Sequence, residues 1–177
     1  MEGYHLPVAH KATVGAHFPT DKTQFPERSD PAFTYQYFIK SDGAPMGTAH
    51  ADNKRLIGEQ RNMSLMPTIF PSHMYVLAPD HLWYLSLQPD ETDHVHIRFG
   101  LALAPEVLAA SSDRDALVSE AVAFLDRVNE EDRVVVEGIF KGSKAPLTTP
   151  GPLSWLEREN HEFTQYLARR MQDQQFV

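Results

Sequence analysis

Two histidines near the start of the chain have the side-chain chemistry of metal ligands. They stand five residues apart in the segment Glu2-Gly-Tyr-His5-Leu-Pro-Val-Ala-His10. In a regular helix that spacing turns the two side chains roughly 140° apart, so they would not share a face. Pro7 lies between them and disturbs the local helix, which permits the two rings to converge. The spacing alone is compatible with a metal-binding pair and with two surface histidines.

An acidic segment in the last third of the chain offers carboxylates that could complete such a site. It reads Asn129-Glu-Glu-Asp132-Arg-Val-Val-Val-Glu137. Acids in the first turn of a helix also complement the helix dipole and cap free amides. By itself, the segment is therefore interpreted more simply as the start of a helix.

The composition limits the kind of site that the chain can build. It holds nine histidines and 24 acidic residues but no cysteine. Disulfides, zinc–thiolate sites, cysteine nucleophiles and an iron–sulfur cluster held by this chain alone are excluded. A net charge of -8 without a basic stripe argues against a nucleic-acid partner. Any metal site must come from His, Asp and Glu.

The length and hydropathy of the sequence bear on its domain organisation and location. The 177 residues suit a single domain, 1–177, with one core. No apolar run approaches the roughly 20 residues that a membrane helix needs, and we expect no signal peptide, because the first residues lack a basic region followed by an apolar stretch. We expect a cytoplasmic protein without membrane contact.

The elements that must position the candidate ligands divide into strands and then helices. Aromatic and β-branched segments between turn residues predict strands at 33–39, 63–70, 73–78, 81–88 and 94–103. Their short connections predict an antiparallel sheet. Helical spacing predicts helices that begin near Ser112, near Glu130 and at Ser154. We therefore expect an α+β fold in which a curved antiparallel sheet packs against a long C-terminal helix, a helix-grip-like arrangement.

In this order, the two chemical segments resemble the catalytic domain of the Rieske non-haem iron oxygenases, which include the ring-hydroxylating dioxygenase α subunits. The resemblance rests on His5-x4-His10 preceded by an acid and a tyrosine, then a sheet, then Glu131-Asp132-x4-Glu137-x4-Gly142. It covers nearly all of the chain, including the Pro-Gly-Pro-Leu-Ser154 step before the last helix. The specific motifs lie towards the two ends of the chain, since the middle matches only in the general character of its segments.

The resemblance implies a mononuclear Fe(II) site with His5, His10 and Asp132 as ligands. A shift of one residue would replace Asp132 by Glu131, and the sequence does not decide between them. Glu2 would be the electron-transfer bridge to the Rieske cluster of a neighbouring subunit. Two imidazoles and one carboxylate leave open positions for O2 and substrate. The implied activity is hydroxylation of an aromatic or other small organic substrate.

The resemblance also implies partners. A Rieske [2Fe–2S] cluster needs two cysteines and two histidines, so this chain, which has no cysteine, does not carry it. We expect a Rieske domain and a reductase as electron donors, and a homotrimer in the complete protein. Only Met1 precedes Glu2, whereas family chains have more sequence there, so we expect a partial, N-terminally truncated catalytic domain. The chain by itself should show little oxygenase activity.

Two other interpretations compete with the oxygenase. His94-Val-His96 on a strand would point both rings to one face, as in a cupin-like metal site. Arg98 extends that face, and a cation there disfavours a divalent metal. The second alternative is a non-catalytic small-molecule-binding module with the same helix-on-sheet fold, in which His5 and His10 bind nothing.

The sheet and helix should enclose an apolar pocket over the metal. Its candidate lining residues are Phe70, Met74, Trp83, Tyr84 and Phe99. Each is more simply explained as plain core, so none is assigned to substrate, and the sequence leaves the substrate unknown.

Overall fold

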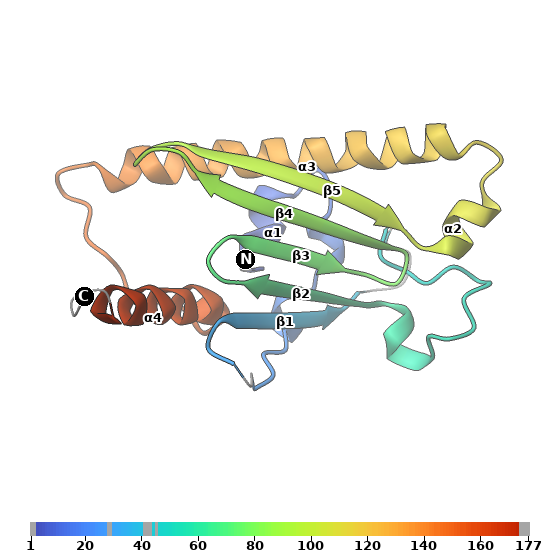
Figure 1. Cartoon of the computed structure of the whole chain (residues 1–177), viewed down its shortest axis with the longest axis horizontal. Coiled ribbons are helices and arrows are strands. Elements are labelled where there is room, and N and C mark those ends of the chain that lie inside the picture. The colour runs from blue at the N-terminus through green and yellow to red at the C-terminus, as the bar shows by residue number, and fades with distance from the viewer. Residues whose placement is uncertain (1–2, 28–29, 41–43, 45, 174–177) are drawn as a thin grey trace.

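Five strands form a single antiparallel sheet in chain order. The computed structural model describes residues 3–27, 30–40, 44 and 46–173, so Glu2, the predicted electron-transfer bridge, lies outside the described residues. The strands are β1 (Phe33–Ile39), β2 (Met63–Ile69), β3 (His73–Leu77), β4 (His81–Pro89) and β5 (Val95–Leu103). Figure 1 shows them as an open meander from β1 to β5. The five predicted strands are confirmed, with ends that differ by at most one residue.

The helices follow the sheet, apart from one short helix at the start. They are α1 (Leu6–Ala9), α2 (Pro105–Ala110), α3 (Arg114–Ser143) and α4 (Arg158–Asp173). Short 3-10 turns span Gly15–His17, Thr20–Lys22, Gly58–Arg61 and Trp155–Glu157. The predicted capping box at Ser154 is confirmed, and it leads through the last of these turns into α4. The described residues contain no helix that is long and apolar enough to cross a membrane.

The helix α3 is continuous for 30 residues, whereas the sequence predicted two helices, the second from about Glu130. The prediction was wrong because neither Gly nor Pro interrupts the segment before Gly138. Arg133 pairs with Glu130 and Glu137 along the exposed surface, at helical spacings that support an unbroken helix. The helix also begins one residue later than expected. Asp113, rather than Ser112, caps it by accepting a hydrogen bond from the amide of Ala116 at 2.9 Å.

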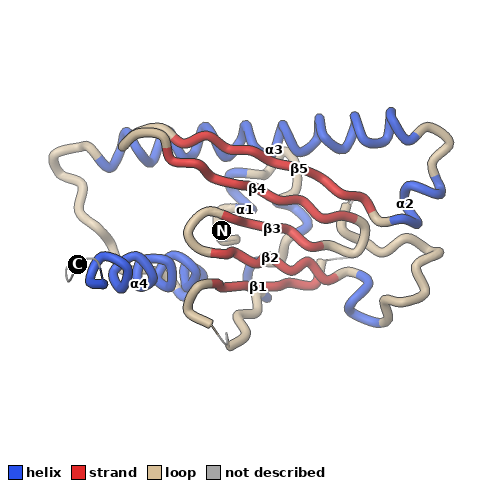
Figure 2. Tube along the Cα trace, in the orientation of Figure 1, coloured by secondary structure: helices blue, strands red, loops and turns tan. Residues whose placement is uncertain are grey.

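One face of the sheet carries the core. Alternate residues point to it, as the period of two in a strand requires, and in β1 every second side chain is buried. The core cluster consists of Leu6, Phe38, Met66, Val76, Trp83, Leu85, Leu125 and Val128. Figures 1 and 2 show α1 against the far side of the sheet and α3 running alongside β5. The packing of Leu6 with Leu125 and Val128 places α1 and α3 over the same face, as the α+β prediction requires.

The helix α4 packs at the β1 side of the sheet through a different kind of contact. The amide of Gln36 donates to Glu159 at 3.2 Å, and Thr34 donates to Glu162. Phe70 lies beside the Phe163 ring, with centroids 5.3 Å apart. This side is closed by paired polar groups and aromatic rings. The extent of the domain, 1–177 as one partial catalytic domain, stays a prediction.

Candidate metal centre

His5 and His10 flank the single turn of α1. His5 occupies the cap position before the turn, and His10 follows it in a non-helical conformation (φ -102°, ψ 29°). Pro7 lies in the first turn, where its missing N–H costs no helical hydrogen bond. Because His10 has left the helix, the angular offset of a regular helix does not apply. The Nε2 atoms of the two histidines face each other at 3.2 Å.

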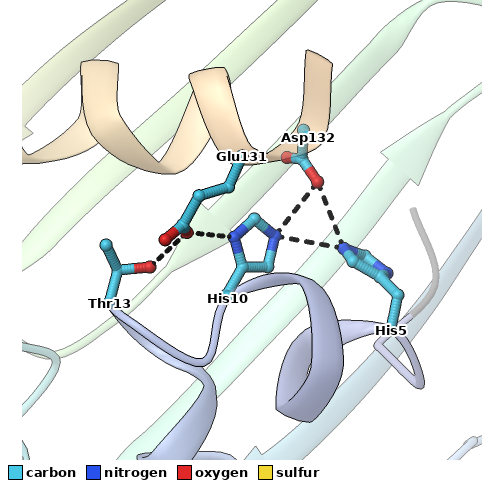
Figure 3. A network of polar contacts seen from close by, with 5 residues as sticks. All are labelled: His5, His10, Thr13, Glu131 and Asp132. Atoms are coloured by element: carbon cyan, nitrogen blue, oxygen red, sulfur yellow. Dashed lines mark hydrogen bonds and ion pairs between the residues drawn. The ribbon is translucent and has the colours of Figure 1, made fainter. Parts of the chain in front are cut away.

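Asp132, near the middle of α3, completes a triangle of donor atoms (Figure 3). Its Oδ1 atom lies 3.0 Å from Nε2 of His10 and 3.3 Å from Nε2 of His5. Val128, one helical turn earlier, packs in the core cluster with Leu6 of α1, and this contact directs Asp132 towards the histidines. The structure therefore brings together the three residues that the sequence predicted as ligands. Their binding of iron stays a prediction.

Glu131 approaches His10 from the opposite edge of the ring. Its Oε2 atom accepts hydrogen bonds from Nδ1 of His10 at 2.8 Å and from Oγ1 of Thr13 at 2.6 Å (Figure 3). Consecutive residues on a helix point about 100° apart, so two acids in a row can reach one ring from two sides. Asp132 thus lies in the triangle with both histidines, and Glu131 lies at the other edge of the His10 ring. Which of the two acids binds a metal, a choice that the sequence left open, stays a prediction. Sequence reasoning missed the orienting role of Glu131 and Thr13.

The charges at the triangle depend on one another. Burial by itself would lower the pKa of His10, but hydrogen bonds to Asp132 and Glu131 and the negative charge of Asp132 raise this pKa above its ordinary value. Burial would raise the pKa of Asp132, but hydrogen bonds from His10 and His5 and their charges bring it to about 2. Asp132 is therefore ionised at neutral pH, which is the form that ligates a metal.

The three donor atoms fit a divalent metal ion. Ligand atoms bound at about 2.1 Å and at right angles to one another lie about 3 Å apart. The separations here are 3.0, 3.2 and 3.3 Å. Both rings direct Nε2 at the same oxygen of Asp132. Two imidazole nitrogens and one carboxylate oxygen suit non-haem iron.

The alternative site at His94 and His96 is not assembled. The described residues do include a second group of potential ligands, Glu91, Asp93 and His94, but all three are exposed in the β4–β5 turn. The ring of His94 pairs with Asp93 at 2.7 Å, and that of His96 pairs with Asp90 at 3.2 Å. The two rings pair with different aspartates, so the alternative cupin-like pair, which Arg98 already disfavoured, does not converge on one point.

A cavity of about 1270 Å³ adjoins the triangle, between the core face of the sheet and the helices α1 and α3. Of the five candidate lining residues, Met74, Trp83 and Phe99 line it. Phe70 packs instead against α4, and Tyr84 is 40% exposed because it alternates to the opposite face of β4. Three of the five pocket candidates are thus placed where the sequence suggested.

Comparison with known proteins gives one family match. The family model described as "Ring hydroxylating alpha subunit (catalytic domain)" matches residues 1–173 of the 177. A search of curated proteins found no match. The matched range includes the histidines beside α1, all five strands, and the acids of α3.

Proposed function

Because the chain belongs to the family of ring-hydroxylating α-subunit catalytic domains, we propose that it is a mononuclear non-haem Fe(II) oxygenase domain that hydroxylates an aromatic or other small organic substrate. Family membership gives oxygenase function in general. The observation that carries the finer proposal is the triangle of His5, His10 and Asp132 beside an apolar cavity.

In this proposal, the three donor atoms hold Fe(II), and an ion with this ligand set supplies open positions for O2 and substrate. The other residues of the network hold the ligands in place. Glu131 accepts the Nδ1 proton of His10, which leaves the Nε2 lone pair directed into the triangle. Thr13 fixes the carboxylate of Glu131 in turn. The network therefore sets the tautomer and the orientation of His10.

The cavity supplies the second requirement, a place for an organic substrate beside the metal. Its wall includes Met66, Val76 and Leu85 from three neighbouring strands. Side chains of this kind exclude water and favour a carbon framework. The cavity is lined by both histidines and by Asp132, so a bound substrate would lie next to the ligand triangle.

The proposed reaction needs electrons from another centre. This chain has no cysteine with which to hold a Rieske [2Fe–2S] cluster. We propose a Rieske domain and a reductase as donors, with Glu2 on the route, in a trimeric complete protein. The chain without that donor is expected to turn over little or no substrate.

The metal content of the purified chain tests this proposal. Protein loaded anaerobically with ferrous iron should retain one iron ion per chain, and His5→Ala, His10→Ala and Asp132→Ala should each lose it. His96→Ala is the matched control, because its exposed ring pairs with Asp90 away from the triangle. Circular dichroism would show that each variant is folded. A folded wild-type chain that retains no iron would contradict the proposal and favour the non-catalytic binding module.

A further inference from the structure

The cavity has a second polar region, on the sheet side. Lys40, the residue after β1, and Ser64 of β2 both line it, and we call these two residues the polar corner. Trp83 of β4 lines the same wall. The ligand triangle, in contrast, comes from α1 and α3. The polar corner therefore faces the same space as the triangle but belongs to a different layer of the fold.

Lys40 is a buried cation that lacks an ion pair within the described part of the chain. Its side chain is 5% exposed, and Nζ donates to the carbonyl of Met46 at 3.0 Å. The nearby acid is Asp80, whose two oxygens already accept from the amide of Gly47 and from Nδ1 of His81, each at 2.7 Å. The ring of Phe18, 5.7 Å from Nζ, is a weaker partner than an anion. A buried ammonium in this state is costly unless something else pairs with it.

Ser64 lies near this ammonium, and its hydroxyl has no hydrogen-bond partner among the described residues. A Cβ atom built on Gly47 would fall 1.2 Å from Nζ of Lys40 and 3.5 Å from Oγ of Ser64, so both polar atoms lie against the same point of the backbone. Ser64 is fully buried. The indole N–H of Trp83, which is 8% exposed, has no hydrogen-bond partner in the described part of the chain either. Three donors on one wall thus have unused capacity.

The apolar part of the wall begins beside the polar corner. Met66 follows Ser64 on the same face of β2, and Val76 and Leu85 continue the wall across β3 and β4. A neutral acceptor such as a hydroxyl would satisfy the serine but would leave the charge of Lys40 unmatched. A carboxylate satisfies both residues of the polar corner, because it accepts several hydrogen bonds and carries the opposite charge.

We propose that the polar corner binds the carboxylate of the substrate, with Lys40 as its charge partner, so that the substrate class is small carboxylic acids with an apolar, aromatic body. This inference rests on the proposed oxygenase function for what happens at the triangle. The inference adds to that function the residues that bind the carboxylate end of the substrate, away from the carbon that reacts. The carboxylate would fix which part of the ring faces His5, His10 and Asp132.

Binding to the metal-free full chain tests the inference without any turnover. The probes are 2-naphthoate and its uncharged counterpart 2-naphthamide, titrated by calorimetry into wild type, Lys40→Met and Ser64→Ala. Lys22→Met is the matched control, because Lys22 is an exposed lysine outside the cavity. Wild type and the control should bind the acid about tenfold or more tightly than the amide, as a charge-assisted contact implies. Lys40→Met should lose this preference while keeping its affinity for the amide, and Ser64→Ala should reduce it in part.

Equal affinity of wild type for the two probes, no binding of either, or a preference that survives in Lys40→Met would overturn the inference. A Lys40→Met chain that does not fold would show the lysine to be a structural residue and would overturn it as well. Iron content, measured separately, keeps this result distinct from the proposed function. A wild-type chain that retains iron but does not prefer the acid would contradict only the carboxylate site at the polar corner. A chain that prefers the acid but retains no iron would contradict only the proposed oxygenase function.

Discussion

The two polar regions of the cavity differ in how completely their charges are matched. In the triangle, Asp132 contacts both histidines, His10 also contacts Glu131, and Glu131 is held by Thr13. In the polar corner, Lys40 has one carbonyl partner and Ser64 has none in the described chain. The first region completes its own geometry without a ligand. The polar corner keeps an unmatched charge that lowers the stability of the fold. This pattern is expected of a residue that binds a ligand.

This comparison predicts opposite signs for two buried substitutions, and the larger effect belongs to the triangle. His10→Ala removes a ring that is 1% exposed and leaves the carboxylates of Glu131 and Asp132 without it. We expect the free energy of unfolding of the metal-free chain to fall by about 3 kcal/mol, from the lost packing and the unpaired charges. Urea denaturation measures this loss. His96→Ala, the exposed control, should change it little, and an unchanged His10→Ala chain would contradict the matched-charge description.

Lys40→Met should instead raise the free energy of unfolding. Burial lowers the pKa of Lys40 from 10.5 to about 8, partly offset by the charge of Asp80. A pKa difference of this size corresponds to roughly 3 kcal/mol by the usual conversion, and we expect a gain of about 2 kcal/mol at pH 7 after relaxation of the site. Thermal or urea unfolding of Lys40→Met beside Lys22→Met measures it. A loss of stability in Lys40→Met would mean that the cation is already well paired.

The same lysine predicts a pH dependence. Below pH 8 the ammonium is charged in both the folded and the unfolded chain, so the full cost of burial is present. Between pH 8 and 10.5 the unfolded chain binds more protons than the folded one, so the contribution of Lys40 to stability rises with pH. The stability difference between Lys40→Met and wild type should therefore shrink across this interval. A difference that stays constant from pH 7 to 10.5 would contradict the burial of the charge.

A smaller effect is expected at the residue that orients His10. Glu131→Gln keeps the shape of the side chain but weakens the hydrogen bond that fixes the His10 tautomer. Iron affinity should fall about tenfold, within the range known for residues that support metal ligands. Competition with a chelator measures it, with Glu130→Gln as control because Glu130 pairs with Arg133 on the exposed side of α3. Complete loss of iron in Glu131→Gln would instead indicate that Glu131 is itself a ligand.

The smallest effect should come from Thr13→Val, which removes only the hydroxyl that donates to Glu131 at 2.6 Å. Iron affinity should fall by about twofold to fivefold, because one neutral hydrogen bond contributes about 1 kcal/mol or less. The chelator competition that measures Glu131→Gln applies here too. If Thr13→Val lowers iron affinity as much in the Glu131→Gln background as in wild type, Thr13 does not act through Glu131.

Much of the fold was predictable because its signals are local. Turn residues separate the strands, and the Ser154 capping box is a four-residue pattern, so both were found from the sequence. The site was harder to predict from the sequence. Spacing left His5 and His10 undecided, and only the resemblance to a family joined them to Asp132. The separate roles of Glu131 and Asp132 depend on which side of one ring each acid reaches, which no linear pattern records.

The polar corner was not predicted, and the reason is physical. A lysine that follows a predicted strand and precedes the sequence Ser-Asp-Gly is most simply interpreted as a surface residue. Its burial depends on Met46, Gly47 and Asp80, and Asp80 lies 33 residues beyond Gly47 in the chain. The sequence gives the residue types, but the burial that makes Lys40 unusual arises only when these segments meet.

The contacts of Glu131 and Asp132 with opposite edges of the His10 ring also restrict the rotation of that ring. A half-turn of the His10 ring about its Cβ–Cγ bond would replace each of the two bonded nitrogens by a carbon. Both contacts, at 2.8 and 3.0 Å, would be lost in the same movement. The ring is therefore locked against flipping before any metal arrives. Metal loading at His10 then requires the departure of a proton and no search among rotamers.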